Sequence, residues 1–88
     1  MAEDLSRVQR LKYRAWRRGM RECDLVLGAF ADRRLPTMSE TELDQFEALM
    51  EAPDDQLWTW ILGSAEPDPA FAGPMLDQVI AFGREELA

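Results

Sequence analysis

The apolar residues of the chain recur every three or four positions, which is the period of an amphipathic helix. We predict a first helix over about residues 4–18 and a second over about 20–33. Gly19 is expected to end the first helix, because glycine adopts a left-handed backbone at little cost. The apolar face of the first helix consists of Leu5, Val8, Leu11, Ala15 and Trp16, and that of the second consists of Cys23, Val26, Leu27 and Phe30.

Three more helices are predicted in the second half of the chain, over about residues 39–51, 55–62 and 74–86. Ser39 and Glu42 have the spacing of a capping box, and Asp54 is expected to be the N-cap of the fourth helix. No segment alternates as a strand does. We therefore predict an all-α, compact five-helix bundle that forms a single domain over residues 1–88. Its one core should contain Leu27, Phe46 and Trp58 or Trp60.

Charge divides the chain into two unlike halves. The net charge of −7 is the balance of +4 in residues 1–35 and −11 in residues 36–88. Arg7, Arg10, Arg14, Arg17 and Arg21 recur at intervals of three or four, a spacing that gathers them on one side of a helix as a basic stripe. We interpret this stripe as a contact surface. The acidic second half disfavours general nucleic-acid binding, which needs a basic face.

The residue types argue against catalysis. The chain has no histidine, so the commonest general base is missing, and we predict neither catalytic residues nor a metal site. Cys23 could be a reactive thiol, and Trp58 or Trp60 could stack on a ligand, but we favour core positions for all three. No apolar run approaches the roughly 20 residues that span a bilayer, and no secretory signal is evident. We expect a cytoplasmic monomer without membrane insertion.

The segment from Arg17 to Glu22 lies where the first two helices meet. Helix capping and helix dipoles explain its arginines, glycine and glutamate one at a time, but they do not explain a whole stripe of arginines. Arg18, Gly19 and Glu22 form the sequence Arg-Gly-x-x-Glu, and with it the chain resembles the flavinylation-factor family that assists succinate dehydrogenase and fumarate reductase. Arg17 and Met20 complete the longer Arg-Arg-Gly-Met-x-Glu form.

The resemblance extends over about residues 7–82. It includes the lead-in Arg10-Leu11-Lys12-Tyr13, Asp24 two positions after the glutamate, and the aromatic run that ends at Trp60. Cys23 stands where an aliphatic residue is usual, and Gln56 alters the acidic start of the fourth helix. Neither departure touches Arg-Gly-x-x-Glu.

The resemblance implies an assembly factor that binds the flavoprotein subunit of succinate dehydrogenase or fumarate reductase and promotes covalent FAD attachment to it. The factor would hold no cofactor stably, since the FAD belongs to the partner. The implied partner-binding residues are Arg14, Arg17, Arg18, Gly19, Met20, Arg21, Glu22 and Asp24. Arg18 and Arg21 would contact carboxylates or backbone carbonyls of the partner, Gly19 would allow close approach, and Glu22 would orient a loop or a basic group.

Two other functions remain open from the residues. One is a helical interaction module of another pathway, since related proteins have also been described as the antitoxin half of a toxin–antitoxin pair. The other is a small nucleic-acid binder that uses the basic first helix.

Overall fold

A computed structural model describes residues 2–87 of the chain and the side chains of residues 7–86. The described part contains five α-helices and one 3₁₀ turn and no strand, which confirms the all-α bundle. In chain order the elements are α1 (Ala2–Trp16), α2 (Arg21–Arg34), η1 (Leu35–Thr37), α3 (Glu40–Leu49), α4 (Asp54–Leu62) and α5 (Pro74–Leu87). No helix within this range is both long and apolar enough to cross a bilayer.

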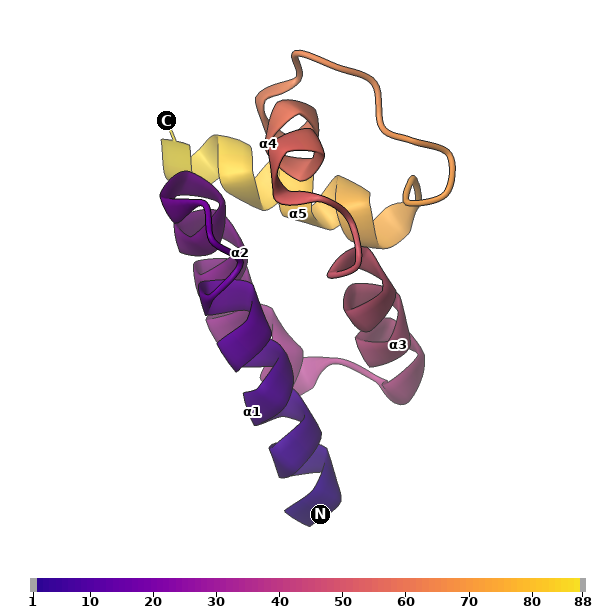
Figure 1. Cartoon of the computed structure of the whole chain (residues 1–88). Coiled ribbons are helices and arrows are strands. Elements are labelled where there is room, and N and C mark those ends of the chain that lie inside the picture. The colour runs from indigo at the N-terminus through magenta and orange to yellow at the C-terminus, as the bar shows by residue number, and fades with distance from the viewer. Residues whose placement is uncertain (1, 88) are drawn as a thin grey trace.

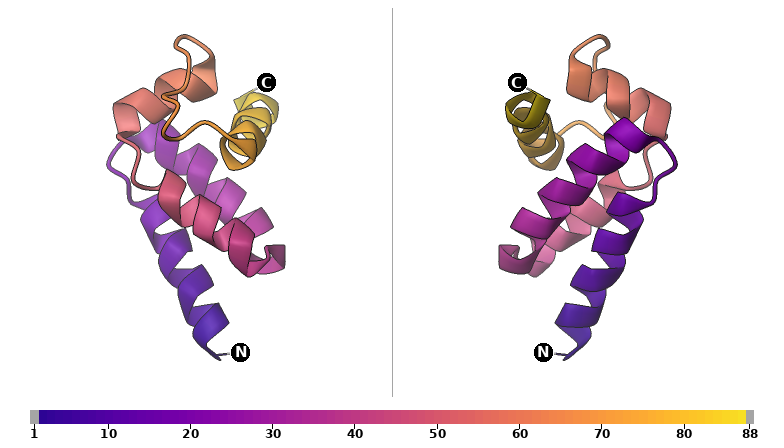
Figure 2. Two further views of the ribbon diagram at one scale, coloured as in Figure 1. Left: turned by 90° about the vertical axis from the view of Figure 1, so that its right-hand side faces the viewer. Right: turned by 90° about the vertical axis from the view of Figure 1, so that its left-hand side faces the viewer.

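The helix α5 contacts α2, α3 and α4, and α2 also contacts α4 (Figure 1). The helix α1 packs along α2, and its N-terminal end projects beyond the other helices in both views of Figure 2. The molecule is therefore elongated, with extents of 40 × 24 × 21 Å. The other end of α1 enters the turn to α2, close to the segment that joins α3 to α4.

One hydrophobic core joins all five helices. The ring of Phe30 stacks on Phe46 with centroids 5.8 Å apart and meets the edge of Phe82 at 5.6 Å. Leu27 and Trp60 are buried in the same core, and Trp58 is packed against it, as predicted. The apolar face predicted for the first helix is also buried at the described positions, namely Val8, Leu11 and Ala15, while the side chain of Leu5 lies outside the described residues.

Trp16 differs from the rest of that face because it is 38% exposed. Its indole lies over Gly28 of α2, where an added Cβ would come within 2.1 Å of the ring. The indole nitrogen also donates a hydrogen bond to Asp32 at 3.3 Å. A glycine inside a helix usually weakens it, but here it creates the space that brings α1 and α2 together.

Three helix ends differ from the sequence-based prediction. The helix α1 ends at Trp16 rather than near Arg18, because the backbone N–H of Arg18 is bonded to the side chain of Asp24. Asp54 is not an N-cap: α4 begins at Asp54 with Pro53 before it, and the Asp54 carboxylate is bonded to Arg18 instead. The predicted capping box of Ser39 and Glu42 is present, but α3 ends earlier, at Leu49.

We expect Phe46→Ala to lower the free energy of unfolding by about 3–5 kcal/mol, the usual cost of truncating a buried aromatic side chain. Phe46 is fully buried and stacks on Phe30, so little of the cavity could collapse. Chemical denaturation would measure the change, with exposed Gln45 replaced by alanine as the control on the same helix. If Phe46→Ala lowers the free energy of unfolding no more than the control does, the position of α3 against the core is wrong.

Candidate functional site

The turn between α1 and α2 contains most of the Arg-Gly-x-x-Glu sequence. Gly19 has a φ of +106°, a backbone conformation that other residues rarely adopt, so glycine is required here for the chain to turn. The Asp24 carboxylate accepts a hydrogen bond from the backbone N–H of Arg18 at 2.9 Å, and the Asp24 N–H donates to the carbonyl of Met20 at 2.8 Å. Asp24 thus fixes the turn from within α2.

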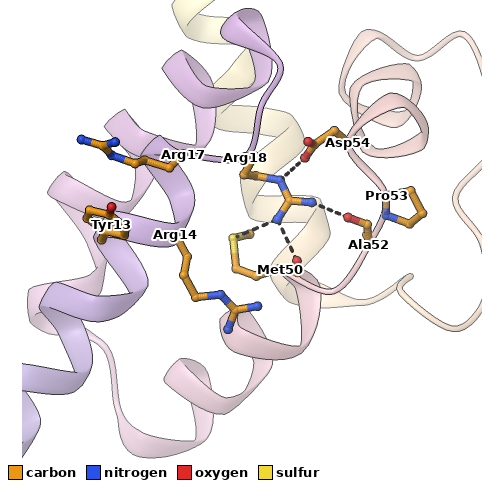
Figure 3. A pocket seen from close by; sticks show the side chains of 8 residues that line it. All are labelled: Tyr13, Arg14, Arg17, Arg18, Met50, Ala52, Pro53 and Asp54. Carbon is orange, nitrogen blue, oxygen red and sulfur yellow. Dashed lines mark hydrogen bonds and ion pairs between the residues drawn. The ribbon is translucent and has the colours of Figure 1, made fainter.

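The side chain of Arg18 anchors this turn to the segment between α3 and α4 (Figure 3). It is 7% exposed, and its Nε donates to the Asp54 carboxylate at 2.5 Å. One terminal nitrogen donates to the carbonyl oxygen of Met50 at 2.8 Å, and the other to that of Ala52. The last carbonyls of a helix have no partner within the helix. Arg18 supplies donors just where α3 has ended.

These contacts change the role expected for Arg18. The sequence led us to expect its guanidinium on a partner's carboxylate or carbonyl groups, but those groups are provided here by Asp54, Met50 and Ala52 of the same chain. Asp54 and the two carbonyls were not among the predicted site residues. Helical spacing cannot reveal a pairing between residues 36 positions apart; the opposite charges were the only signal.

Part of the basic stripe on α1 is also paired within the molecule. Arg7 bridges to Glu40 at 2.8 Å, Asp44 at 2.5 Å and Glu47 at 3.2 Å on α3. Arg14 is bonded to Glu51 at 2.7 Å. The charges of Arg7 and Arg14 are therefore balanced by acids of α3 and of the turn that follows it. A contact between the stripe and a partner stays a prediction.

The remaining predicted site residues lie at the outside of the turn. Arg17, Gly19, Arg21 and Glu22 are exposed, whereas Met20 is partly buried against the core. Among the side chains of residues 7–86, no carboxylate lies within 4.0 Å of the guanidinium groups of Arg17 or Arg21. We refer to Arg17–Glu22 as the corner. The corner presents the side chains of Arg17, Arg21 and Glu22 and the backbone of Gly19 to the solvent.

An open cleft with a volume of about 350 Å³ lies beside the corner (Figure 3). On one side it is lined by Tyr13, Arg14, Arg17 and Arg18, and on the other by Met50 and the segment 52–54. The guanidinium of Arg17 lies over the Tyr13 ring, 4.8 Å from its centroid. Of the predicted site residues only the three arginines line this cleft, and Tyr13 and Pro53 are additions that the sequence did not indicate.

The alternatives for Cys23 and Trp60 do not fit the structure. Cys23 is fully buried, and this burial raises the pKa of its thiol to about 11, outweighing the opposing attraction of the nearby Arg18 guanidinium. A reactive cysteine needs the opposite shift. Trp60 is buried and packs against Phe71 with ring centroids 5.9 Å apart, so its face is occupied by the protein itself.

The fold and the corner define a small all-α protein that presents Gly19 and Glu22 of its Arg-Gly-x-x-Glu sequence on the outside and holds Arg18 inside. This chain belongs to the family described as flavinator of succinate dehydrogenase, whose model matches residues 9–82. The family predicted from Arg-Gly-x-x-Glu is thereby confirmed. No solved structure shows a significant match to the chain.

Curated relatives come from bacteria and from eukaryotes. The chain is 36% identical over 86 residues to "FAD assembly factor SdhE" of Acetobacter pasteurianus, covering 96% of this chain and 79% of the relative. It is 35% identical over 72 residues to the protein of the same name from Vibrio cholerae, with 82% and 83% covered. It is also 32% identical over 80 residues to "Succinate dehydrogenase assembly factor 2, mitochondrial" of Dictyostelium discoideum, with 86% and 57% covered.

We expect Arg18→Gln to destabilise the fold by about 2–4 kcal/mol, because it breaks a mostly buried ion pair and leaves carbonyls without donors. Arg17→Gln is the matched control, since Arg17 is the adjacent arginine and is exposed. The free energy of unfolding of Arg17→Gln should stay within about 0.5 kcal/mol of the wild-type value. Urea denaturation would measure both. Equal losses for the two variants would contradict the anchoring role of Arg18.

The raised pKa of Cys23 gives a second prediction. The thiol ionises near pH 9 in the unfolded chain and near pH 11 in the folded one, so its contribution to stability is present below pH 9 and is lost as the pH rises to 11. The stability difference between the wild type and Cys23→Ala should therefore shrink across this range. Thermal denaturation of both proteins at several pH values would measure this difference. A constant difference would contradict the buried, neutral thiol.

Proposed function

We propose that this protein is an assembly factor that binds the flavoprotein subunit of succinate dehydrogenase or fumarate reductase and promotes the covalent attachment of FAD to it. The observation that carries the proposal is the match to the flavinator family over residues 9–82, which includes the corner. Relatives that cover most of this chain are named FAD assembly factors. The protein acts as a cytoplasmic monomer.

The corner suits a factor that holds a partner rather than one that does chemistry itself. Two anchors, the Arg18 side chain and the Asp24 carboxylate, fix its backbone before any partner arrives. A rigid surface lowers the entropic cost of bringing a flavin and a side chain of the flavoprotein into a reactive arrangement. The bond-forming chemistry then belongs to the partner and its FAD. The factor has no catalytic residue of its own and holds no cofactor stably.

The described contacts suggest different roles within the corner. Arg18 positions the turn, and Arg17, Arg21 and Glu22 are the side chains that reach the partner. The surface at Gly19 is open, since a Cβ added there would meet only Asp54 Oδ2, at 3.7 Å. A nucleic-acid function for α1 is less well supported, since Arg7 and Arg14 already bind carboxylates of the second half of the chain.

The proposal is tested by purifying the flavoprotein subunit from cells that lack this protein and adding the purified factor with FAD. Covalent flavin is then measured as the fluorescence of the subunit band in a denaturing gel. We expect the factor to increase the covalent flavin severalfold. Attachment that is equally fast and complete without the factor would contradict the proposal. So would a wild-type factor that does not bind the subunit.

Variants of Glu22 show, in the same assay, whether this residue holds the partner or takes part in the reaction. Glu22→Gln should keep part of the activity, because the amide preserves the shape and one acceptor oxygen, and Glu22→Ala should lose more. Loss of a charge in the first turn of α2 lowers stability by only about 0.3–1 kcal/mol, so a drop of tenfold or more in affinity would report a partner contact. A rate that collapses in Glu22→Gln at unchanged affinity would show instead that Glu22 takes part in the reaction.

A further inference from the structure

The cleft beside the corner contains three arginines that differ in what they already bind. Arg18 is bonded to Asp54, and Arg14 is bonded to Glu51. Arg17 has no carboxylate within 4.0 Å among the described side chains and stacks on Tyr13 instead. The cleft therefore has an unmatched positive charge, and that charge is on Arg17.

The stacking holds Arg17 ready to bind. A guanidinium held over an aromatic ring can still donate from its N–H groups, and its side chain has less conformational freedom to lose. Tyr13 is 61% exposed and adds a hydroxyl group at the same end of the cleft. Arginine in this setting is suited to carboxylate recognition, because its donors match the two oxygens.

The far side of the cleft is less polar. It is formed by Met50, Ala52 and Pro53, with Asp54 already held by Arg18. A volume of about 350 Å³ corresponds to roughly twelve water molecules of about 30 Å³ each, enough for one or two side chains. The cleft is thus matched to an acidic side chain with apolar neighbours. A basic segment would meet Arg14, Arg17 and Arg18 as like charges.

We infer that this cleft binds an acidic segment of the flavoprotein subunit, with a carboxylate on Arg17 and its neighbouring side chains against Pro53 and Met50. This inference rests on the proposed function and specifies the partner chemistry. The cleft adjoins the corner, so a protein bound to the corner would bring its own surface across the opening. A loop of that partner is the occupant that the position of the cleft favours.

The test compares the affinities of three variants for the purified flavoprotein subunit at low and at moderate salt. Arg17→Gln should weaken binding about 10- to 100-fold, as expected for loss of a charge-assisted hydrogen bond, and should flatten the salt dependence. Arg17→Lys should recover part of the affinity. Arg84→Gln removes an exposed arginine of α5, outside the cleft, and should change the affinity less than twofold. Melting temperatures would verify that all three variants are folded.

A photo-reactive phenylalanine analogue in place of Tyr13 identifies the occupant. The expected cross-link, located by mass spectrometry, is to a flavoprotein peptide that contains Asp or Glu. The same analogue at exposed Leu62 is the control and should not give this product. A cross-link to a second copy of this chain, or to a segment without acidic residues, would overturn the inference.

Different binding results would overturn the proposed function and this inference. A wild-type chain that binds no flavoprotein subunit would overturn the proposed function and this inference with it. A wild-type chain that binds, but no more tightly than Arg17→Gln, would overturn the inference alone.

Discussion

The site depends on the bonds made by the mostly buried guanidinium of Arg18. It joins the turn after α1 to the turn after α3 by an ion pair with Asp54 and by hydrogen bonds to two backbone carbonyls. The core packs the helices, but apolar contacts do not set the direction of a turn at the surface. Directional hydrogen bonds to a charged group do. The position of the corner relative to α3 and α4 follows from this one side chain.

Two adjacent arginines consequently have opposite environments. Arg18 faces inward and is 7% exposed, while Arg17 lies outward on the Tyr13 ring. The end of α1 at Trp16 makes this possible, because the residues after it no longer follow helical spacing. A partner bound to the corner would contact Arg17 directly. Arg18 would affect binding only by holding the turn in position.

The sequence predicted those features that depend on neighbouring residues. The capping box at Ser39 and the left-handed Gly19 after α1 are both local signals, and each is present. The family followed from the short sequence around Gly19. What failed were inferences that treated a residue as if only its neighbours mattered. Asp54 has the local signature of an N-cap, yet its carboxylate is bound by an arginine from the other half of the chain. The ion pairs of the stripe were missed for the same reason, since Arg7 and Arg14 bind acids of α3 and of the turn that follows it.

The anchor of Arg18 also determines when the corner can exist. Its partners are 32 to 36 residues away along the chain, so these bonds form only after a large loop has closed. The α1–α2 hairpin alone contains the whole Arg-Gly-x-x-Glu sequence but lacks the acceptors that orient Arg18. A nascent chain or a proteolytic fragment that ends before Met50 would therefore carry the motif without its working geometry. Under the proposed function, the corner would reach the geometry that recognises a partner only when the second half of the chain has been synthesised and folded.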